Sequence, residues 1–250
     1  MKVYDTLIIG SGYTSLGYAI ARGDTVICED GELCDTGFSM PVRCFALPDY
    51  EPKNILTREL FDYYRSLGII ARGMQNTGAL ECGFCGFALK HNVEILLKCR
   101  VIDKRVTEDG AFDVSVIGGG GIEHILAQRV LDMRKKCGER WLTVLFKTEN
   151  PDSDISTLEA AFAGSKIEPA FYESRYALHI PCHRDEDINE ARLRLYHLWD
   201  TTEHTARLLY TAPALAVVSD NLGETPTDAD FDSFLSAFDG GADFAHADRG

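Results

Sequence analysis

The chain has 250 residues, of which 45% are hydrophobic, so it can bury a core without disulfide or metal cross-links. Its formal net charge of −14 repels nucleic-acid phosphates and anionic lipid headgroups. The densest basic run, Arg134–Lys136, has three residues. We therefore expect no nucleic-acid partner.

Targeting and membrane segments are not expected either. An apolar strand pattern begins within four residues of the first methionine, which leaves no room for a secretory leader. Apolar runs such as Leu7–Ile9 and Ala212–Val218 are far shorter than the roughly 20 residues that cross a bilayer. We expect a cytoplasmic protein with no membrane partner, whose eight cysteines are reduced thiols.

The chain begins with a strand, a helix and a second strand. Residues 4–9 form a short apolar run that ends at a glycine, which is typical of a buried parallel strand. Residues 13–22 carry apolar side chains at helical spacing, and residues 25–28 give the second strand. After a segment rich in Gly, Pro and Asp at 31–56, Thr57 is expected to cap another helix.

Strands dominate the stretch that follows a predicted helix at 79–91. Four successive glycines, Gly118–Gly121, separate two of these strands. A phosphate cradle uses a helix N-terminus, and no helix start follows these glycines, so we interpret them as a hairpin turn. The predicted strands are 93–98, 100–107, 111–117, 122–127 and 128–133.

Strands and helices alternate again after a short basic linker, Arg134–Arg140. Asp187 and Glu190 have the spacing of a capping box, and aromatic residues near the C-terminus predict an amphipathic helix docked on the protein. We expect a dinucleotide-binding domain at 1–134, and a smaller α+β region at 135–250 that covers the substrate and returns to the first domain. The predicted elements of this half are strands 141–147, 167–173, 176–181, 206–210 and 214–218 and helices 155–163 and 187–199.

A glycine-rich turn lies between the first strand and the first helix. In a dinucleotide-binding turn the first glycine allows the tight turn, the second lets the backbone approach a pyrophosphate, and the third position needs a small side chain. Serine at the third position adds little bulk. The residues predicted to contact the cofactor here are Gly10, Ser11, Gly12, Tyr13, Thr14 and Ser15.

A carboxylate follows at the expected distance. Glu29 ends the second strand, 17 residues after Gly12, where an acidic residue can accept hydrogen bonds from the ribose hydroxyls. Asp30 is the neighbouring alternative. A carboxylate here repels the 2′-phosphate of NADP, which leaves FAD or NAD as the cofactor.

At this point the sequence resembles the FAD-dependent oxidoreductase superfamily with the two-dinucleotide-type Rossmann fold. The likeness rests on YDTLIIGSGYTSLGYAIA…VICED and on ALKHNVEILLKCRVIDKRV…FDVSVIGGGGIEHILAQRVLDM, and it covers residues 3–133, about half of the chain. It implies an α/β fold: a Rossmann-like parallel sheet that binds FAD or NAD(P), a three-stranded β excursion and a smaller α+β second region. The excursion favours FAD over NAD.

The resemblance also implies roles for two further residues. Val101 would lie at the flavin adenine, and Arg43, in the loop after the ribose carboxylate, would pass the cofactor phosphates and could neutralise them. The implied activity is hydride transfer from an unidentified small-molecule substrate to flavin.

Two motifs differ from the family pattern. The returning strand ends in Asp132-Met133-Arg134 where the family has a small-residue turn, and Ser219–Gly223 is only similar to its late Gly-Asp motif. These differences keep two other functions open: a dinucleotide-binding protein without redox turnover, and an NAD-dependent dehydrogenase.

Candidate catalytic residues are few. Cys82 and Cys85 lie at a predicted helix start, where the helix dipole lowers a thiolate pKa and a redox pair could form, although free cysteines are also common core residues. No second Cys-x-x-Cys follows them, so we expect no zinc site.

His179, Cys182 and His183 form the densest group of metal-competent side chains. Strand alternation would separate His179 from Cys182, so we interpret the histidines as solvated residues at a strand end and expect no metal. If the second half covers the flavin, His179 and Arg175 could face it as acid, base or anion clamp.

Overall fold

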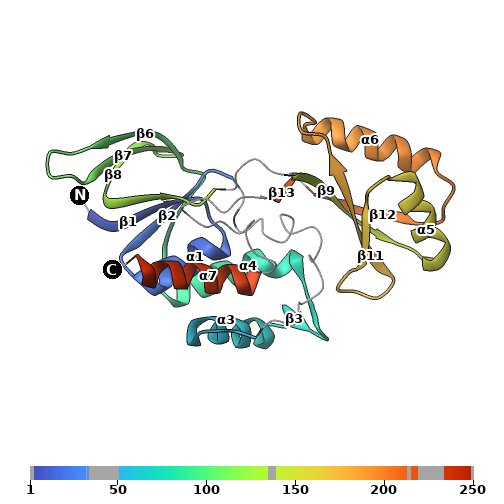
Figure 1. Ribbon diagram of the computed structural model, residues 1–250, viewed down its shortest axis with the longest axis horizontal. Coiled ribbons are helices and arrows are strands. Elements are labelled where there is room, and N and C mark those ends of the chain that lie inside the picture. The colour runs from blue at the N-terminus through green and yellow to red at the C-terminus, as the bar shows by residue number, and fades with distance from the viewer. Residues whose placement is uncertain are drawn as a thin grey trace.

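The computed structural model describes residues 3–31, 33, 51–134, 139–212, 215–218 and 234–248. These residues form two lobes, each built on one main sheet (Figure 1). The predicted domain boundary at residue 134 falls between the last strand of the first sheet and the first strand of the second. Within the described ranges, no helix is long and apolar enough to cross a bilayer.

The sheet of the first lobe has six strands. Four neighbours, β5, β2, β1 and β8, run parallel, and β7 and β6 continue the sheet antiparallel. The predicted α/β fold, with a parallel sheet and a three-stranded excursion, is confirmed. In sheet order the strands are β5 (Glu94–Leu97), β2 (Thr25–Glu29), β1 (Val3–Ile9), β8 (Gly121–Asp132), β7 (Phe112–Gly118) and β6 (Arg100–Val106).

One long strand, β8, joins the excursion to the parallel sheet. Its first part pairs antiparallel with β7 and its last part pairs parallel with β1, and Leu126 and Ala127 pair with both neighbours. The prediction of two separate strands at 122–127 and 128–133 is therefore wrong. Residues 122–133 include no glycine or proline that would break the ladder. The predicted hairpin turn is confirmed, because Gly118 pairs with Gly121.

Helices cover the first sheet and share an aromatic core. The rings of Tyr13, Tyr64, Phe84 and Phe234 are fully buried and pack edge-on or stacked against one another. The helices are α1 (Tyr13–Arg22), α3 (Ile55–Ser66), α4 (Leu80–Lys90) and α7 (Phe234–Ala247). A short hairpin, β3 (Ile70–Ala71) and β4 (Met74–Gln75), and a 3-10 turn, Thr77–Ala79, connect α3 to α4.

Helix α3 begins earlier than predicted. The side chain of Asn54 accepts a hydrogen bond of 2.9 Å from the backbone N–H of Thr57, so Asn54 is the cap and Thr57 lies in the first turn. Asparagine is as good a cap as threonine, and local sequence did not separate the two.

Helix α7 closes the first lobe by lying alongside α1 (Figure 1). The two backbones approach closely at two glycines: a Cβ on Gly17 would lie 2.1 Å from the carbonyl oxygen of Phe238, and one on Gly241 would lie 2.0 Å from that of Thr14. The predicted C-terminal amphipathic helix is confirmed, although Phe231 of the predicted stripe lies outside the described residues.

A buried carboxylate, Asp239, anchors α7 to the start of α3. It is 1% exposed and accepts hydrogen bonds from the backbone N–H of Lys53, the Asn54 amide and the Thr57 hydroxyl, at 3.0, 2.5 and 2.5 Å. Three donors satisfy a charge that would otherwise be costly to bury. Asp239 therefore fixes α7 to a second helix of the lobe.

The second lobe is an antiparallel sheet covered on one face by two helices. The buried face consists of residues such as Val144, Leu178 and Leu195, which pack together. Its strands, in sheet order, are β10 (Lys166–Pro169), β11 (Arg175–Cys182), β9 (Glu139–Lys147) and β12 (Arg207–Thr211), and β13 (Ala216–Val218) also pairs with β9. The helices are α5 (Pro151–Ala161) and α6 (Ile188–Thr201).

Helix termini in this lobe follow local signals. The capping box of Asp187 and Glu190 is confirmed at the start of α6. Helix α5 begins four residues before the predicted start, because Pro151 occupies the first turn, where its fixed φ suits a helix and its missing N–H is not needed.

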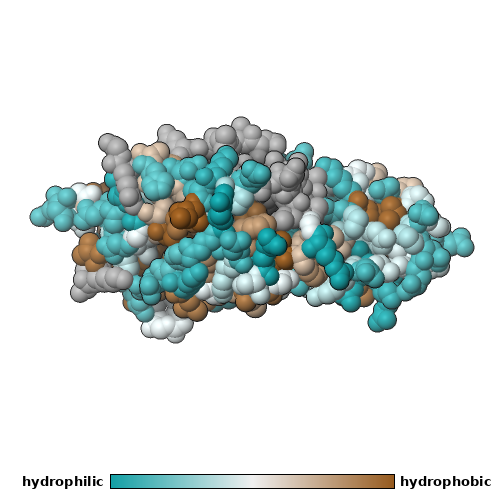
Figure 2. Space-filling model, turned by 90° about the horizontal axis from the view of Figure 1, so that it is seen from below, coloured by the Kyte–Doolittle hydropathy of each residue, from teal (hydrophilic) through white to brown (hydrophobic). Residues whose placement is uncertain are grey.

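The other face of the second sheet is turned toward the first lobe. Ala177 and Leu145 on this face pack with Met74 of the β3–β4 hairpin, and the amide of Asn76 donates to the Tyr172 hydroxyl at 3.4 Å. The face shown in Figure 2 is mostly hydrophilic, with separated apolar patches.

Substituting Gly17 by alanine should separate α1 from α7. The new Cβ has no room against the Phe238 carbonyl, so we expect a loss of about 3 kcal/mol in the free energy of unfolding, the upper end of the usual overpacking cost. Urea denaturation measures it. Gly119→Ala is the control: its Cβ meets no atom within 4 Å, so stability should change by less than about 0.5 kcal/mol. Equal stability of both variants would contradict the close approach.

Candidate functional site

The carboxyl ends of β1, β2 and β8 meet at one edge of the first sheet. Ile9 is the partner of both Cys28 and Asp132, so the residues that follow these three strands are neighbours. The chain leaves β1 toward β2 on one side and later returns as β8 on the other side. Ligands of open α/β sheets bind in the crevice at such a crossover. We call this place the carboxyl edge.

The turn after β1 depends on glycine. Gly10 has a φ of +101°, in the left-handed region, and a Cβ there would lie 3.0 to 3.2 Å from Arg134 atoms. Its N–H donates to the carbonyl oxygen of Cys28 at 2.9 Å. Gly12 is the N-cap of α1 and has no side chain to cap the helix, whose N-terminus therefore presents backbone and a positive dipole.

Serine at the third motif position closes the turn. The Ser15 hydroxyl donates to the carbonyl oxygen of Gly10 at 2.7 Å, and its oxygen lies 3.5 Å from the sulfur of Met133. The small side chain thus fits between the turn and β8 and adds a hydrogen bond that a glycine lacks.

Glu29 reaches back to the glycine turn. Its Oε2 accepts hydrogen bonds from both the backbone N–H and the hydroxyl of Ser11, each 2.7 Å long, and its Oε1 accepts from the N–H of Gly31 at 2.6 Å. Asp30 is exposed. Of the two predicted carboxylates, Glu29 is therefore the one that contacts the turn.

Arg134 and Asp132 form an ion pair at the same edge. The guanidinium donates to both carboxylate oxygens, from Nε at 2.9 Å and from Nη2 at 2.6 Å. Both side chains are about half exposed. In the sequence, Asp132 and Arg134 are a departure from a family motif at the start of a basic run. Their proximity to Gly10 could not be predicted, because it depends on the pairing of β8 with β1.

Similarity to known proteins is confined to structure. No family model and no curated protein matches the sequence. The p-nitrophenol 4-monooxygenase PnpA from Pseudomonas putida matches with a TM-score of 0.55 and 14% identity, over 86% of this chain and 68% of that one. Aklavinone-11 hydroxylase with FAD and aklavinone matches with a TM-score of 0.53 and 14% identity, over 98% of this chain and 62% of that one. A flavoprotein/dehydrogenase from Cytophaga hutchinsonii matches with a TM-score of 0.55 and 12% identity, over 98% of this chain and 77% of that one.

The chain shares its fold with these monooxygenase, hydroxylase and flavoprotein/dehydrogenase structures. It spans less than two thirds of the length of the aklavinone-11 hydroxylase.

Within this fold, the other predicted cofactor residues are placed as follows. Tyr13 and Thr14 are fully buried, and the Tyr13 hydroxyl lies 2.6 Å from that of Tyr64, so the Tyr13 ring belongs to the core. Val101 is half-buried and packs against the apolar cluster that includes Leu7 and Val114. The hydrogen bond from the N–H of Cys99 to the Glu29 carbonyl, 2.9 Å long, brings this start of β6 next to the carboxyl edge.

Two predicted features lie outside the described residues. They are Arg43 and the segment 219–223 that is similar to a Gly-Asp motif.

The two cysteines of α4 differ in exposure. Cys82 is exposed, whereas Cys85 is half-buried against the aromatic core. Burial raises the pKa of the Cys85 thiol, so the prediction of a lowered thiolate pKa is wrong for this residue: desolvation outweighs the helix dipole. Burial also raises the pKa of Cys28, beside Glu29, to about 12.

His179 lies on the face of the second sheet that is turned toward the first lobe. It is fully buried, with Nδ1 3.1 Å from the Thr143 hydroxyl and Nε2 3.3 Å from Oε1 of Glu168. The expectation of solvated histidines is wrong for His179, which lies within β11 on a buried part of the sheet, whereas His183, just after the strand, is exposed. Its catalytic role stays a prediction.

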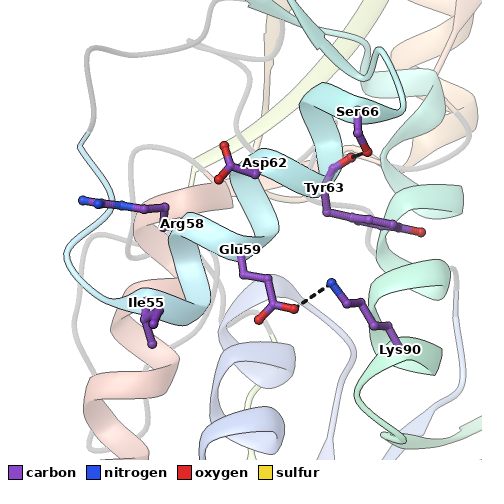
Figure 3. Close-up of a pocket in the computed structure, with 7 residues that line it drawn as sticks. All are labelled: Ile55, Arg58, Glu59, Asp62, Tyr63, Ser66 and Lys90. Atoms are coloured by element: carbon purple, nitrogen blue, oxygen red, sulfur yellow. Dashed lines mark hydrogen bonds and ion pairs between the residues drawn. The ribbon is translucent and has the colours of Figure 1, made fainter.

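A surface groove on the first lobe is lined by residues of α3 and α4 and does not include the carboxyl edge (Figure 3). Within it the cation of Lys90 pairs with Glu59 at 2.7 Å. We assign it no ligand. The lining residues are Ile55, Arg58, Glu59, Asp62, Tyr63, Ser66 and Lys90.

Thiol labelling checks the placement of the cysteines. In the native protein at pH 8, iodoacetamide should modify the exposed Cys82 and leave Cys28 unmodified, because burial shields Cys28 and a thiol with a pKa of about 12 has almost no thiolate at this pH. Peptide mass spectrometry measures both. The denatured protein, in which both peptides should label, is the control, and equal native labelling would contradict the described environment of Cys28.

Proposed function

We propose that the chain is an FAD-dependent oxidoreductase that holds the ADP half of FAD at the carboxyl edge and oxidises a small molecule by hydride transfer to flavin. One observation carries the proposal: in this fold, a left-handed glycine turn, a helix N-terminus and a carboxylate that bonds to the turn meet at the sheet crossover.

The residues at this edge fit an ADP group. The turn at Gly10 and Gly12 brings backbone close to a diphosphate, and the start of α1 favours its negative charge. Glu29 would accept hydrogen bonds from ribose hydroxyls with the same carboxylate that now accepts one from the Ser11 hydroxyl. Bound FAD would supply the hydride-accepting chemistry.

We further propose that the second lobe covers the substrate. The support is the orientation of the sheet face that α5 and α6 do not cover. This face is turned toward the first lobe and carries the buried His179–Glu168 pair. Such a pair can move a proton to or from a bound small molecule.

A second candidate is a protein that binds the dinucleotide without redox turnover. The specific observation in its favour is the Arg134–Asp132 pair, where resemblance to the superfamily implies a small-residue turn. This alternative would be favoured if dithionite reduces the bound flavin but no candidate donor does. NAD binding without FAD binding would favour a dehydrogenase, and thermal unfolding in the presence of each cofactor separates the two.

Absorption spectra before and after FAD addition test the main proposal. We expect wild-type protein to retain a yellow flavin after gel filtration and to bleach on dithionite titration. Glu29→Ala should weaken FAD binding at least tenfold, about 1.4 kcal/mol, because the ribose loses its acceptor. Glu123→Ala, which removes an exposed carboxylate near the other end of β8, is the matched control and should bind like wild type. Protein that stays colourless at saturating FAD would overturn the proposal.

A further inference from the structure

We propose that Arg134 binds the cofactor diphosphate and that Asp132, which pairs with this arginine, competes with the diphosphate and so lowers the affinity for FAD. This inference rests on the proposed function. Neither residue belongs to the glycine motif.

The backbone fixes Arg134 next to the turn. The N–H of Met133 donates to the carbonyl oxygen of Ile9 at 2.9 Å, which continues the β1–β8 ladder up to the residue before Arg134. A Cβ on Gly10 would lie 3.0 Å from Cγ and 3.1 Å from the backbone nitrogen of Arg134. The side chain therefore starts at the place where the turn opens to a phosphate.

The charges at this edge require a cation. Glu29, Asp30 and Asp132 lie at the ends of the two strands that flank the turn, so three carboxylates are close to it, in a chain of net charge −14. A diphosphate would meet their combined repulsion, and the helix dipole supplies only about half an elementary charge. Among the described residues that directly follow β1, β2 and β8, Arg134 is the one basic side chain; Lys98, which follows β5, donates to the carbonyl oxygen of Gly31 at 2.9 Å.

The guanidinium can exchange one partner for the other. It now binds the Asp132 carboxylate through two hydrogen bonds, and the same planar fork matches two phosphate oxygens. Its side chain is 54% exposed and that of Asp132 is 51% exposed. Exposed pairs of this kind contribute little to stability, so a dianionic ligand can displace the carboxylate.

Replacing Asp132 by asparagine isolates its effect. Oδ1 of Asp132 also accepts the backbone N–H of Arg134 at 3.1 Å, and an asparagine keeps an acceptor for this turn. The change therefore removes the competing charge with little change of backbone.

FAD titration, followed by quenching of flavin fluorescence, tests the proposal on wild type, Arg134→Ala and Asp132→Asn. We expect the alanine variant to bind at least tenfold more weakly and the asparagine variant to bind several-fold more tightly. The affinity of Arg134→Ala should also depend less on NaCl concentration, because an ionic contact with the diphosphate is lost.

Arg105→Ala is the matched control. Arg105 pairs with Asp103 at 2.7 Å near the end of β6, several residues from the Cys99–Glu29 contact at the start of this strand, so its loss should leave FAD affinity unchanged. Arg134→Gln gives a second neutral variant if the alanine protein fails to fold, and thermal unfolding checks each variant.

Two results would overturn the inference in distinguishable ways. If neutral variants of Arg134 bind FAD as tightly as wild type or more tightly, the arginine obstructs or ignores the diphosphate, while the proposed function stands. If neither wild type nor Asp132→Asn binds FAD at any salt concentration, the proposed function fails and this inference fails with it.

Discussion

The candidate site depends on one constraint, the parallel pairing of β1 with two neighbours. Its register aligns Ile9 with Cys28 on one side and with Asp132 on the other. A slip of one residue would invert every side chain of β1, whose Leu7 and Ile8 pack on opposite faces of the sheet. Because the cores on both faces fix the register, the turn, the ribose carboxylate and the ion pair are held at the same edge.

The orientation of the turn depends in addition on the C-terminal helix. Helix α1 begins at the turn, and at Gly17 its backbone lies against the backbone of α7. Gly241 of α7 allows the same close approach from the other side. Asp239 then fixes α7 to α3 through three hydrogen bonds. The last helix of the chain thus supports the first functional turn, and contacts far from the ligand hold the helix N-terminus in place.

Local sequence signals predicted most of the fold. Hydrophobic period, glycine turns and the capping box gave the strands, the hairpin and α6, since each depends on residues close together in the chain. The site was predicted only in part. The Ser11–Glu29 bonds, the Arg134–Asp132 pair beside Gly10 and the burial of His179 depend on register between distant strands and on lobe packing, which spacing does not encode.

The polar groups of the carboxyl edge form many of their hydrogen bonds with one another. Glu29 bonds to the Ser11 N–H and hydroxyl, and Arg134 bonds to Asp132. Binding a dinucleotide would therefore exchange internal hydrogen bonds for external ones, and each exchange contributes only a small net free energy. Affinity then depends on which internal partners are released. Releasing a neutral donor such as Ser11 costs little free energy. Separating Arg134 from Asp132 leaves an unpaired carboxylate near the diphosphate, so this pair should contribute most of the electrostatic free energy that opposes binding.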